Sequence, residues 1–207
     1  MMYNICIGGD EMKANFLKRV LAFCFDYFIL TLVLSFITVG FNTSNESFYT
    51  EISNISKEYN EGNISVNEYN DKLMELEYEY QKDNLPVNII NIVLFIGYFI
   101  VFGYLNKGQT LGKKICKIKI IKENNESINL KDMMLRELLG ASLLEGGMII
   151  IPTYIRKLLP LFKLTMIVDP LKYIAYALTI GSIIYAYFQA NTQSFHDKVA
   201  KTIVVKQ

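Results

Sequence analysis

Long apolar runs separated by polar, charged segments dominate the chain. Val20–Phe41 is 22 residues long and contains one charge, Asp26, while Val87–Leu105 is 19 residues long and contains none. A helix rises about 1.5 Å per residue, so each run is long enough to cross the ~30 Å hydrocarbon core of a bilayer. A cleaved signal peptide is excluded for the first run, because its apolar stretch would be only about 7 to 15 residues long. We therefore predict a membrane-spanning helix in each run.

Two further spans are predicted from less regular patterns. Leu138–Ile155 is 18 residues long but contains Glu145 and Pro152, which make it polar and bendable for a span. The last span has an uncharged centre of 16 residues, Tyr173–Phe188, and reaches full length when its flanking charges lie at the membrane interface. We predict an all-α membrane protein, a single domain over residues 1–207, with four transmembrane helices at about 20–41, 87–105, 138–155 and 170–190. A re-entrant arrangement of the last two spans is the alternative.

Basic residues are distributed unevenly around these spans. With the N-terminus inside, the inner segments contain 14 Lys and Arg and the outer segments contain 7. Cytoplasmic loops carry the excess of basic residues, so this ratio predicts a multi-pass protein with cytoplasmic N- and C-termini. The basic segment Arg156–Lys163 falls outside in this topology, and an amphipathic helix at the membrane interface is the alternative there.

The segment between the first two spans, residues 42–86, is strongly acidic and has a helical pattern of its own. It holds 10 Asp and Glu against 3 Lys, a composition that fits only an aqueous face. Apolar residues recur at intervals of three and four on both sides of Asn60–Asn63, which predicts two amphipathic helices joined by a turn. Ser65 and Glu68 have the spacing of a capping box. We predict an inserted extracytoplasmic helical hairpin, either a solvated spacer or a surface for a partner or for cations.

On the cytoplasmic side, two segments have the character of strands. Lys114–Ile121 shows a period of two, and Lys201–Lys206 is rich in β-branched residues. Paired, they would form a small basic β-hairpin or sheet beneath the membrane, close enough to meet anionic lipid head groups. The lipid bilayer is thus the first expected partner.

Composition removes several functional classes. Hydrophobic residues make up 52% of the chain and the mean hydropathy is +0.24, which is too apolar for one ordinary soluble domain. With a net charge of +1 and a pI near 7.6, the chain lacks the excess of basic residues that a nucleic-acid partner requires. One His and three scattered Cys give no metal-ligand spacing and imply no disulfide. We expect no metal site, no cofactor and no nucleic acid.

Two enzyme-like patterns fail on inspection, so we expect no enzymatic activity. Gly108–Lys113 is one residue short of a phosphate-binding loop, lacks the hydroxyl residue after its Lys and follows a membrane span instead of a soluble strand. Ser194, His196 and Asp197 are the residue types of a catalytic triad. As neighbours in one extended segment, however, they would not point to a common centre.

Four short motifs, in order along the chain, resemble those of a known family. They are Arg19 with Asp26, the turn Gly108-Gln109-Thr110-Leu111-Gly112-Lys113 with the strand after it, Leu135-Arg136, and His196-Asp197 with the strand that follows. This pattern resembles the RDD family of bacterial polytopic membrane proteins, named for one Arg and two Asp, here Arg19, Asp26 and Asp197. The resemblance covers Lys18 to the C-terminus apart from the hairpin, and Lys198 and Lys201 depart from it where Arg and Gly are usual. It implies location in the bacterial cytoplasmic membrane and suggests cation transport.

The depth of the acidic residues in the membrane indicates what they could do. Asp26 lies two helical turns, ~10 Å, from Arg19 on the same helix face, so the two cannot pair directly. An uncompensated carboxylate at that depth costs ~2.5 to 3.5 kcal/mol, so Asp26 should face the bundle, pair with a cation or be protonated. Glu145 lies ~13 Å beyond Arg136 and could meet Asp26 at one level. Two carboxylates there would give a site for Na⁺ or K⁺, or a pair sharing a proton, as a monovalent cation/proton exchanger needs.

Each of these residues also has a structural interpretation. Asp26 would lock helices together through Arg136 or His196. Arg19 would extend to lipid phosphate, and Asp197 would clamp one of the two arginines or accept from backbone amides. In that case the protein is a non-transporting membrane scaffold or accessory subunit that binds partners through its hairpin and basic sheet. A transporter of this size is expected to form a homo-oligomer, because four short helices enclose little space.

The first residues resemble translated regulatory sequence. Gly8–Met12 is what a purine-rich ribosome-binding sequence followed by ATG would encode, and Met12-Lys13 opens like an ordinary N-terminus. We expect the native protein to begin at Met12.

Overall fold

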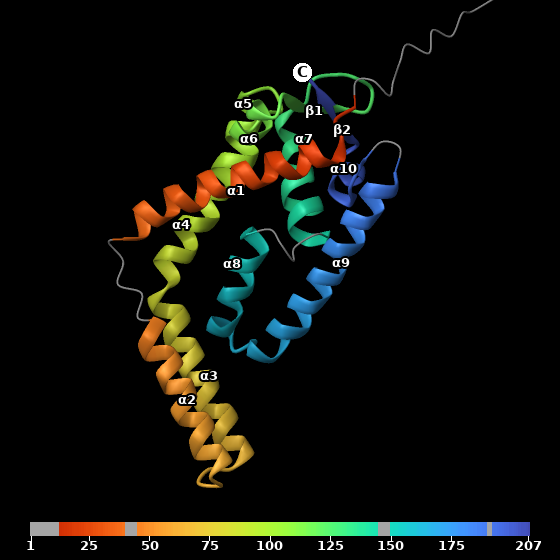
Figure 1. The fold of residues 1–207 in the computed structure, drawn as a ribbon. Helices are drawn as coiled ribbons and strands as arrows, with labels where there is room; N and C mark the ends of the chain where they lie inside the picture. The colour runs from red at the N-terminus through yellow and green to blue at the C-terminus, as the bar shows by residue number, and fades with distance from the viewer. Residues whose placement is uncertain (1–12, 40–44, 145–149, 190–191) are drawn as a thin grey trace, which may run out of the picture.

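The protein is a mostly helical bundle with a two-stranded sheet at one end and a helical hairpin at the other (Figure 1). The computed structural model describes residues 13–39, 45–144, 150–189 and 192–207. Within them, three stretches are long and apolar enough to cross a membrane: Phe16–Thr38, Leu85–Leu105 and Thr165–Phe188. They correspond to the first, second and fourth predicted spans, each beginning two to five residues earlier than predicted.

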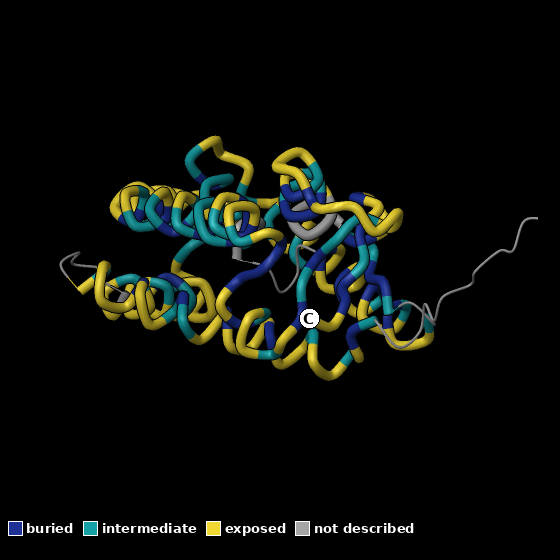
Figure 2. The backbone as a smooth tube through the Cα atoms, turned by 90° about the horizontal axis from the view of Figure 1, so that it is seen from above, coloured by how far each residue is buried: buried dark blue, intermediate teal, exposed yellow. Residues whose placement is uncertain are grey.

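The first long helix, α1 (Phe16–Thr38), begins at Asn15, whose side-chain oxygen accepts a hydrogen bond from the backbone N–H of Leu17. Its buried residues recur every fourth position and face the bundle: Ala22, Asp26, Leu30 and Leu34. Its outer face is apolar and exposed, with Phe28 at 64% and Phe36 at 75%. Figure 2 shows the same alternation of exposed and buried positions along the helices. An exposed apolar surface of this extent is suited to lipid contact.

The second span contains a π-helical turn. It consists of α4 (Leu85–Ile96), the π-helical η1 (Gly97–Phe102) and α5 (Gly103–Leu105), which follow one another without a break. Such turns widen an α-helix locally and are frequent at functional sites. Here the turn carries Tyr98, which takes part in the site described below.

The third predicted span, 138–155, is not among these three stretches, so the predicted count of four spans is not confirmed. The segment expected to form that span starts within the π-helical η2 (Leu135–Leu144), which follows α7 (Leu130–Met134), and ends within α8 (Ile150–Leu158). Glu145 lies outside the described residues. After α8, two short 3₁₀ turns, η3 (Leu159–Phe162) and η4 (Thr165–Ile167), lead into α9 (Val168–Phe188).

The predicted helical hairpin is confirmed as a structure. It consists of α2 (Asn45–Asn60) and α3 (Val66–Asp83), and the capping box of Ser65 and Glu68 is present. Aromatic pairs close the seam between the helices. The rings of Phe48 and Tyr80 stack at 4.1 Å and those of Tyr59 and Tyr69 lie 4.8 Å apart. The hairpin and the sheet lie at opposite ends of the molecule (Figure 1).

The predicted sheet is present but its first strand is shorter than expected. Strand β1 (Ile118–Lys122) pairs antiparallel with β2 (Thr202–Lys206), and Ile120 lies opposite Val204. The prediction of a strand from Lys114 was wrong, because α6 (Leu111–Ile115) occupies that stretch. Thr110 caps α6, its hydroxyl accepting from the backbone N–H of Lys113, and this local bond favours a helical turn over an extended chain.

Candidate functional site

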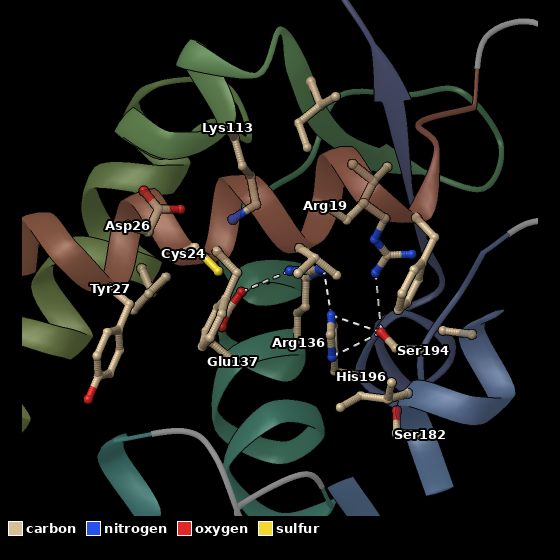
Figure 3. Close-up of a pocket in the computed structure, with 18 of the residues that line it drawn as sticks. Arg19, Cys24, Asp26, Tyr27, Lys113, Arg136, Glu137, Ser182, Ser194 and His196 are labelled. Atoms are coloured by element: carbon tan, nitrogen blue, oxygen red, sulfur yellow. Dashed lines mark hydrogen bonds and ion pairs between the residues drawn. The ribbon is translucent and has the colours of Figure 1, made fainter. Parts of the chain in front are cut away.

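Two networks of polar residues border one pocket of about 550 Å³, which we call the central pocket. Side chains from α1, α4 and η1, α6, η2, α9 and the segment around α10 (Phe195–Ala200) line it, near the sheet end of the bundle. Its apolar wall includes Phe23, Phe95, Phe99 and Ile183, and its charged lining includes Arg19, Asp26, Lys113, Arg136 and Glu137 (Figure 3). The pocket therefore brings together charged side chains from segments distant in sequence.

The first network, the arginine clamp, consists of Arg19, Arg136, Ser194 and Asp197. Ser194 is the N-cap of α10, and its backbone N–H donates to Oδ2 of Asp197 at 3.1 Å, which fixes the carboxylate at the start of that helix. Oδ1 accepts from Nη2 of Arg136 at 2.8 Å and from its Nε at 3.2 Å, while Oδ2 accepts from Arg19. One buried carboxylate thus ties α1, η2 and α10 together.

Charge in the clamp favours the ionised form of Asp197. Burial by itself would raise the pKa of Asp197, but the guanidinium groups of Arg19 and Arg136, with His196, hold that pKa well below its ordinary value. Asp197 therefore remains a carboxylate at any physiological pH. As a carboxylate it can orient the two arginines.

The clamp corrects two expectations about its residues. The prediction that Arg19 extends to lipid phosphate was wrong, because its guanidinium donates to Asp197 and, at 3.3 Å, to the hydroxyl of Ser194. The expectation of an extended segment around His196 was also wrong, because the segment forms α10. The hydroxyl of Ser194 does come within 3.0 Å of the His196 ring, yet it also lies 2.8 Å from Asp197 as part of the cap. These contacts are those of a helix start.

Arg136 extends the clamp towards the central pocket. Its Nη1 donates to Oε1 of Glu137 at 2.9 Å, and its Nη2 lies 2.7 Å from Nε2 of His196. Glu137 is 8% exposed and lines the pocket together with His196. A second carboxylate and an imidazole therefore border the pocket beside the clamp.

The second network, the Asp26 network, joins α1 to Tyr98 of η1 and to the first residues of α6 with their cap, Thr110. Oδ1 of Asp26 accepts from the hydroxyl of Tyr98 at 2.5 Å and from the backbone N–H of Gly112 at 2.6 Å, and Oδ2 accepts from the hydroxyl of Thr110 at 2.5 Å. The expected bond to Arg136 or His196 is therefore wrong. Every direct donor to Asp26 among the described residues is a neutral group.

Glycines in the turn permit this close docking. A Cβ at Gly112 would collide with the carbonyl oxygen of Ala22 and with the carboxylate of Asp26. Gly108 has a φ of +87° and lies against the carbonyl of Ile120, where a side chain would not fit. Gln109 donates from Nε2 to the carbonyl of Ile118 at 2.9 Å. The motif thus connects the Asp26 network to the sheet.

Lys113 connects the Asp26 network to the pocket electrostatically. Its Nζ lies 3.3 Å from Oγ1 of Thr110, whose hydroxyl donates to Asp26, and 5.9 Å from the ring centre of Phe99. Figure 3 shows its amino end directed between Asp26 and Glu137. Burial, together with the positive charge of Arg136, lowers the pKa of Lys113, although Asp26 and Glu137 oppose that shift. A lysine in this position loses its proton more readily than an exposed one.

Sequence reasoning missed two residues of the site, Tyr98 and Glu137, and it considered Ser194 only for a catalytic triad, not as the N-cap of α10. A tyrosine in an apolar run is usually interpreted as an anchor at the membrane interface, so the sequence did not indicate that Tyr98 is a partner of Asp26. Glu137 follows Arg136 directly, and two adjacent charged residues at the start of a membrane segment could have indicated a functional position.

Among the described residues, no three His, Cys, Asp or Glu side chains are grouped so as to hold a metal ion.

Comparison with known proteins identifies a family. A sequence model of the RDD family matches residues 13–201, a range that includes Arg19, Asp26, Lys113, Arg136 and Asp197. No curated protein and no solved structure matches the chain. The matched range covers every residue of the two networks around the central pocket.

Proposed function

The chain belongs to the RDD family, and from this premise we propose that it is a multi-pass protein of the bacterial cytoplasmic membrane that exchanges a monovalent cation for protons. Its apolar helices and its family support the membrane location. The exchange reaction is supported by the charges that meet in the central pocket.

The observation that carries this proposal is the arrangement of Lys113 and Asp26 around Thr110. Asp26 has a buried charge and only neutral hydrogen-bond donors among the described residues, so Lys113, one hydroxyl away, is its nearest compensating cation along the hydrogen-bond network. A carboxylate without a cation is unstable at such a depth. When Lys113 loses its proton, Asp26 therefore loses its compensating positive charge, and a second cation in the pocket would be needed to stabilise the carboxylate.

The exchange cycle follows from the need of Asp26 for one compensating cation. When Lys113 gives up its proton, one monovalent cation enters the pocket and balances Asp26. When a proton returns to Lys113, the ammonium again balances Asp26 and the cation is released. One proton and one cation thus alternate, and the charge of the pocket stays constant. The lowered pKa of Lys113 brings its deprotonation closer to neutral pH.

The test is proton-coupled Na⁺ and K⁺ flux in proteoliposomes at matched folded yield. Flux should be lost in Asp26→Asn, which removes the carboxylate charge. It should also be lost in Lys113→Arg, because a guanidinium keeps its proton at all accessible pH values. Lys114→Arg is the matched control, since Lys114 is the exposed neighbour and should retain wild-type flux. Glu145→Gln tests whether that acid forms a pair with Asp26, as the sequence suggested.

The second candidate function is a non-transporting scaffold or accessory subunit. It is favoured by the hairpin, which extends away from the bundle and carries 10 acidic residues in the segment 42–86 (Figure 1). Absence of flux in the wild-type protein, combined with lower stability of Asp26→Asn, would refute exchange. The search would then turn to partners of the hairpin.

A further inference from the structure

Helix α4 carries a stripe of buried amide side chains. Asn88 and Asn91 are 2% and 3% exposed, Asn84 at the start of the helix is 8% exposed, and Gln81 at the end of α3 is 7% exposed. Asn84, Asn88 and Asn91 follow a spacing of four and three residues, so they lie on one face of the helix. The opposite face is apolar and open, with Ile89 and Val93 at 47% and 61%.

The amides of this stripe are only partly satisfied. Asn88 donates from Nδ2 to Oε1 of Gln81 at 3.3 Å, and Asn84 donates to the carbonyl of Tyr80 at 2.8 Å. The side-chain oxygen of Asn91 is buried and accepts no hydrogen bond from the described residues. Buried acceptors are almost always paired, and an unpaired one inside a membrane helix calls for a ligand or water.

The stripe runs from the base of the hairpin towards the central pocket. It begins at the base of the acidic hairpin, where α3 ends and α4 begins, and runs along the face of α4 that is buried in the bundle. Helix α8 packs against α4 (Figure 1). One helical turn beyond Asn91, ~6 Å along the axis, the ring of Phe95 is 1% exposed and lines the central pocket. The amides therefore lead from the hairpin to the wall of that pocket.

We propose that this amide stripe is the hairpin-side path by which a monovalent cation reaches the central pocket, with the side-chain oxygen of Asn91 as a ligand and Phe95 as the barrier. This inference rests on the proposed function, since it supplies the route for the exchanged cation. Neutral amide oxygens can replace the hydration shell of a monovalent cation without holding it too tightly to leave. The excess of acidic residues on the hairpin raises the local cation concentration at the entrance.

A cysteine-accessibility experiment tests the path without depending on transport. Asn88→Cys and Asn91→Cys are made in the full-length chain with Cys6, Cys24 and Cys116 replaced by Ser, and are treated with a polar, membrane-impermeant thiol reagent. Ile89→Cys and Val93→Cys are the matched controls on the lipid-facing side of the same helix. The two stripe positions should react several-fold faster than the two controls, and Na⁺ or K⁺ should slow the reaction at Asn88→Cys, which keeps the Asn91 oxygen.

Two results would overturn the inference: reaction at the stripe positions no faster than at the controls, or reaction that neither cation slows. A flux measurement then separates this inference from the proposed function. Asn91→Leu should lower cation flux, while Asn91→Gln, which keeps a neutral amide oxygen, and Ile89→Leu should retain more of it. Flux in the wild type with no effect of Asn91→Leu would leave exchange intact and reject the path. Accessible, cation-protected positions without wild-type flux would reject exchange.

Discussion

The arginine clamp predicts a large loss of stability when Asp197 loses its charge. Asp197→Asn keeps the side-chain volume, but the guanidinium groups of Arg19 and Arg136 both lose their shared buried counter-ion. Removing one partner of a buried ion pair costs ~3 to 5 kcal/mol, and each kcal/mol shifts the Tm of a chain of this size by about 2 to 4 °C. We therefore expect the Tm to fall by roughly 6 to 20 °C.

The assay is the fraction of detergent-purified protein that stays monodisperse after heating. The control is Asp71→Asn on the exposed face of α3, which should change the Tm by less than about 2 °C. Because the pKa of Asp197 is lowered in the folded state, its stabilising effect is complete above its unfolded value, ~3.9, and is lost only as the pH falls through the lower folded value. The difference in Tm between wild type and Asp197→Asn should thus stay constant from about pH 8 to about pH 5. A small difference, or one that vanishes over this range, would refute the clamp.

Two further predictions concern single backbone positions. Gly112→Ala should destabilise the protein by about 1 to 3 kcal/mol or more, seen as a lower Tm or a lower folded yield, because the added Cβ would collide with Ala22 and Asp26. The control is Gly181→Ala, which should leave the Tm nearly unchanged because no atom lies within 4 Å of its added Cβ. Lys201→Gly should raise the Tm by about 2 to 4 °C, because Lys201 ends α10 with a φ of 52° and a left-handed conformation costs a non-glycine residue ~1 kcal/mol. Lys198→Gly, inside the same helix, should lower it; the opposite order of the two glycine variants would contradict the argument.

Much of the fold could be predicted because segments that face lipid and segments that face water differ in their residue composition. The apolar runs at Val20–Phe41 and Val87–Leu105 gave helices within a few residues of their structural bounds. The hairpin was predicted from its three- and four-residue spacing and its capping box. The segment from Lys114 was misread as a strand, because a two-residue alternation in a short basic stretch did not reveal the cap at Thr110.

The site was harder to predict than the spans. Its residues could be identified as charges in apolar surroundings, but their pairing depends on how α1, η2 and α10 meet. Seven residues separate Arg19 from Asp26, yet the partner of Arg19 lies 178 residues away. Local spacing does not contain that information. Tyr98 reaches Asp26 across 72 positions, and no local pattern marks it as a donor.

The distance along the chain between Arg19 and Asp197 also has a consequence for how the protein is made. At bacterial rates of about 5 to 20 residues per second, the ribosome needs roughly 10 to 40 s to add the 178 residues that separate them. During that interval Arg19 and Arg136 must enter the insertion machinery without their acidic counter-ion. A nascent chain that stalls before α10 therefore keeps Arg19 without Asp197, and Arg136 with Glu137 as its carboxylate partner.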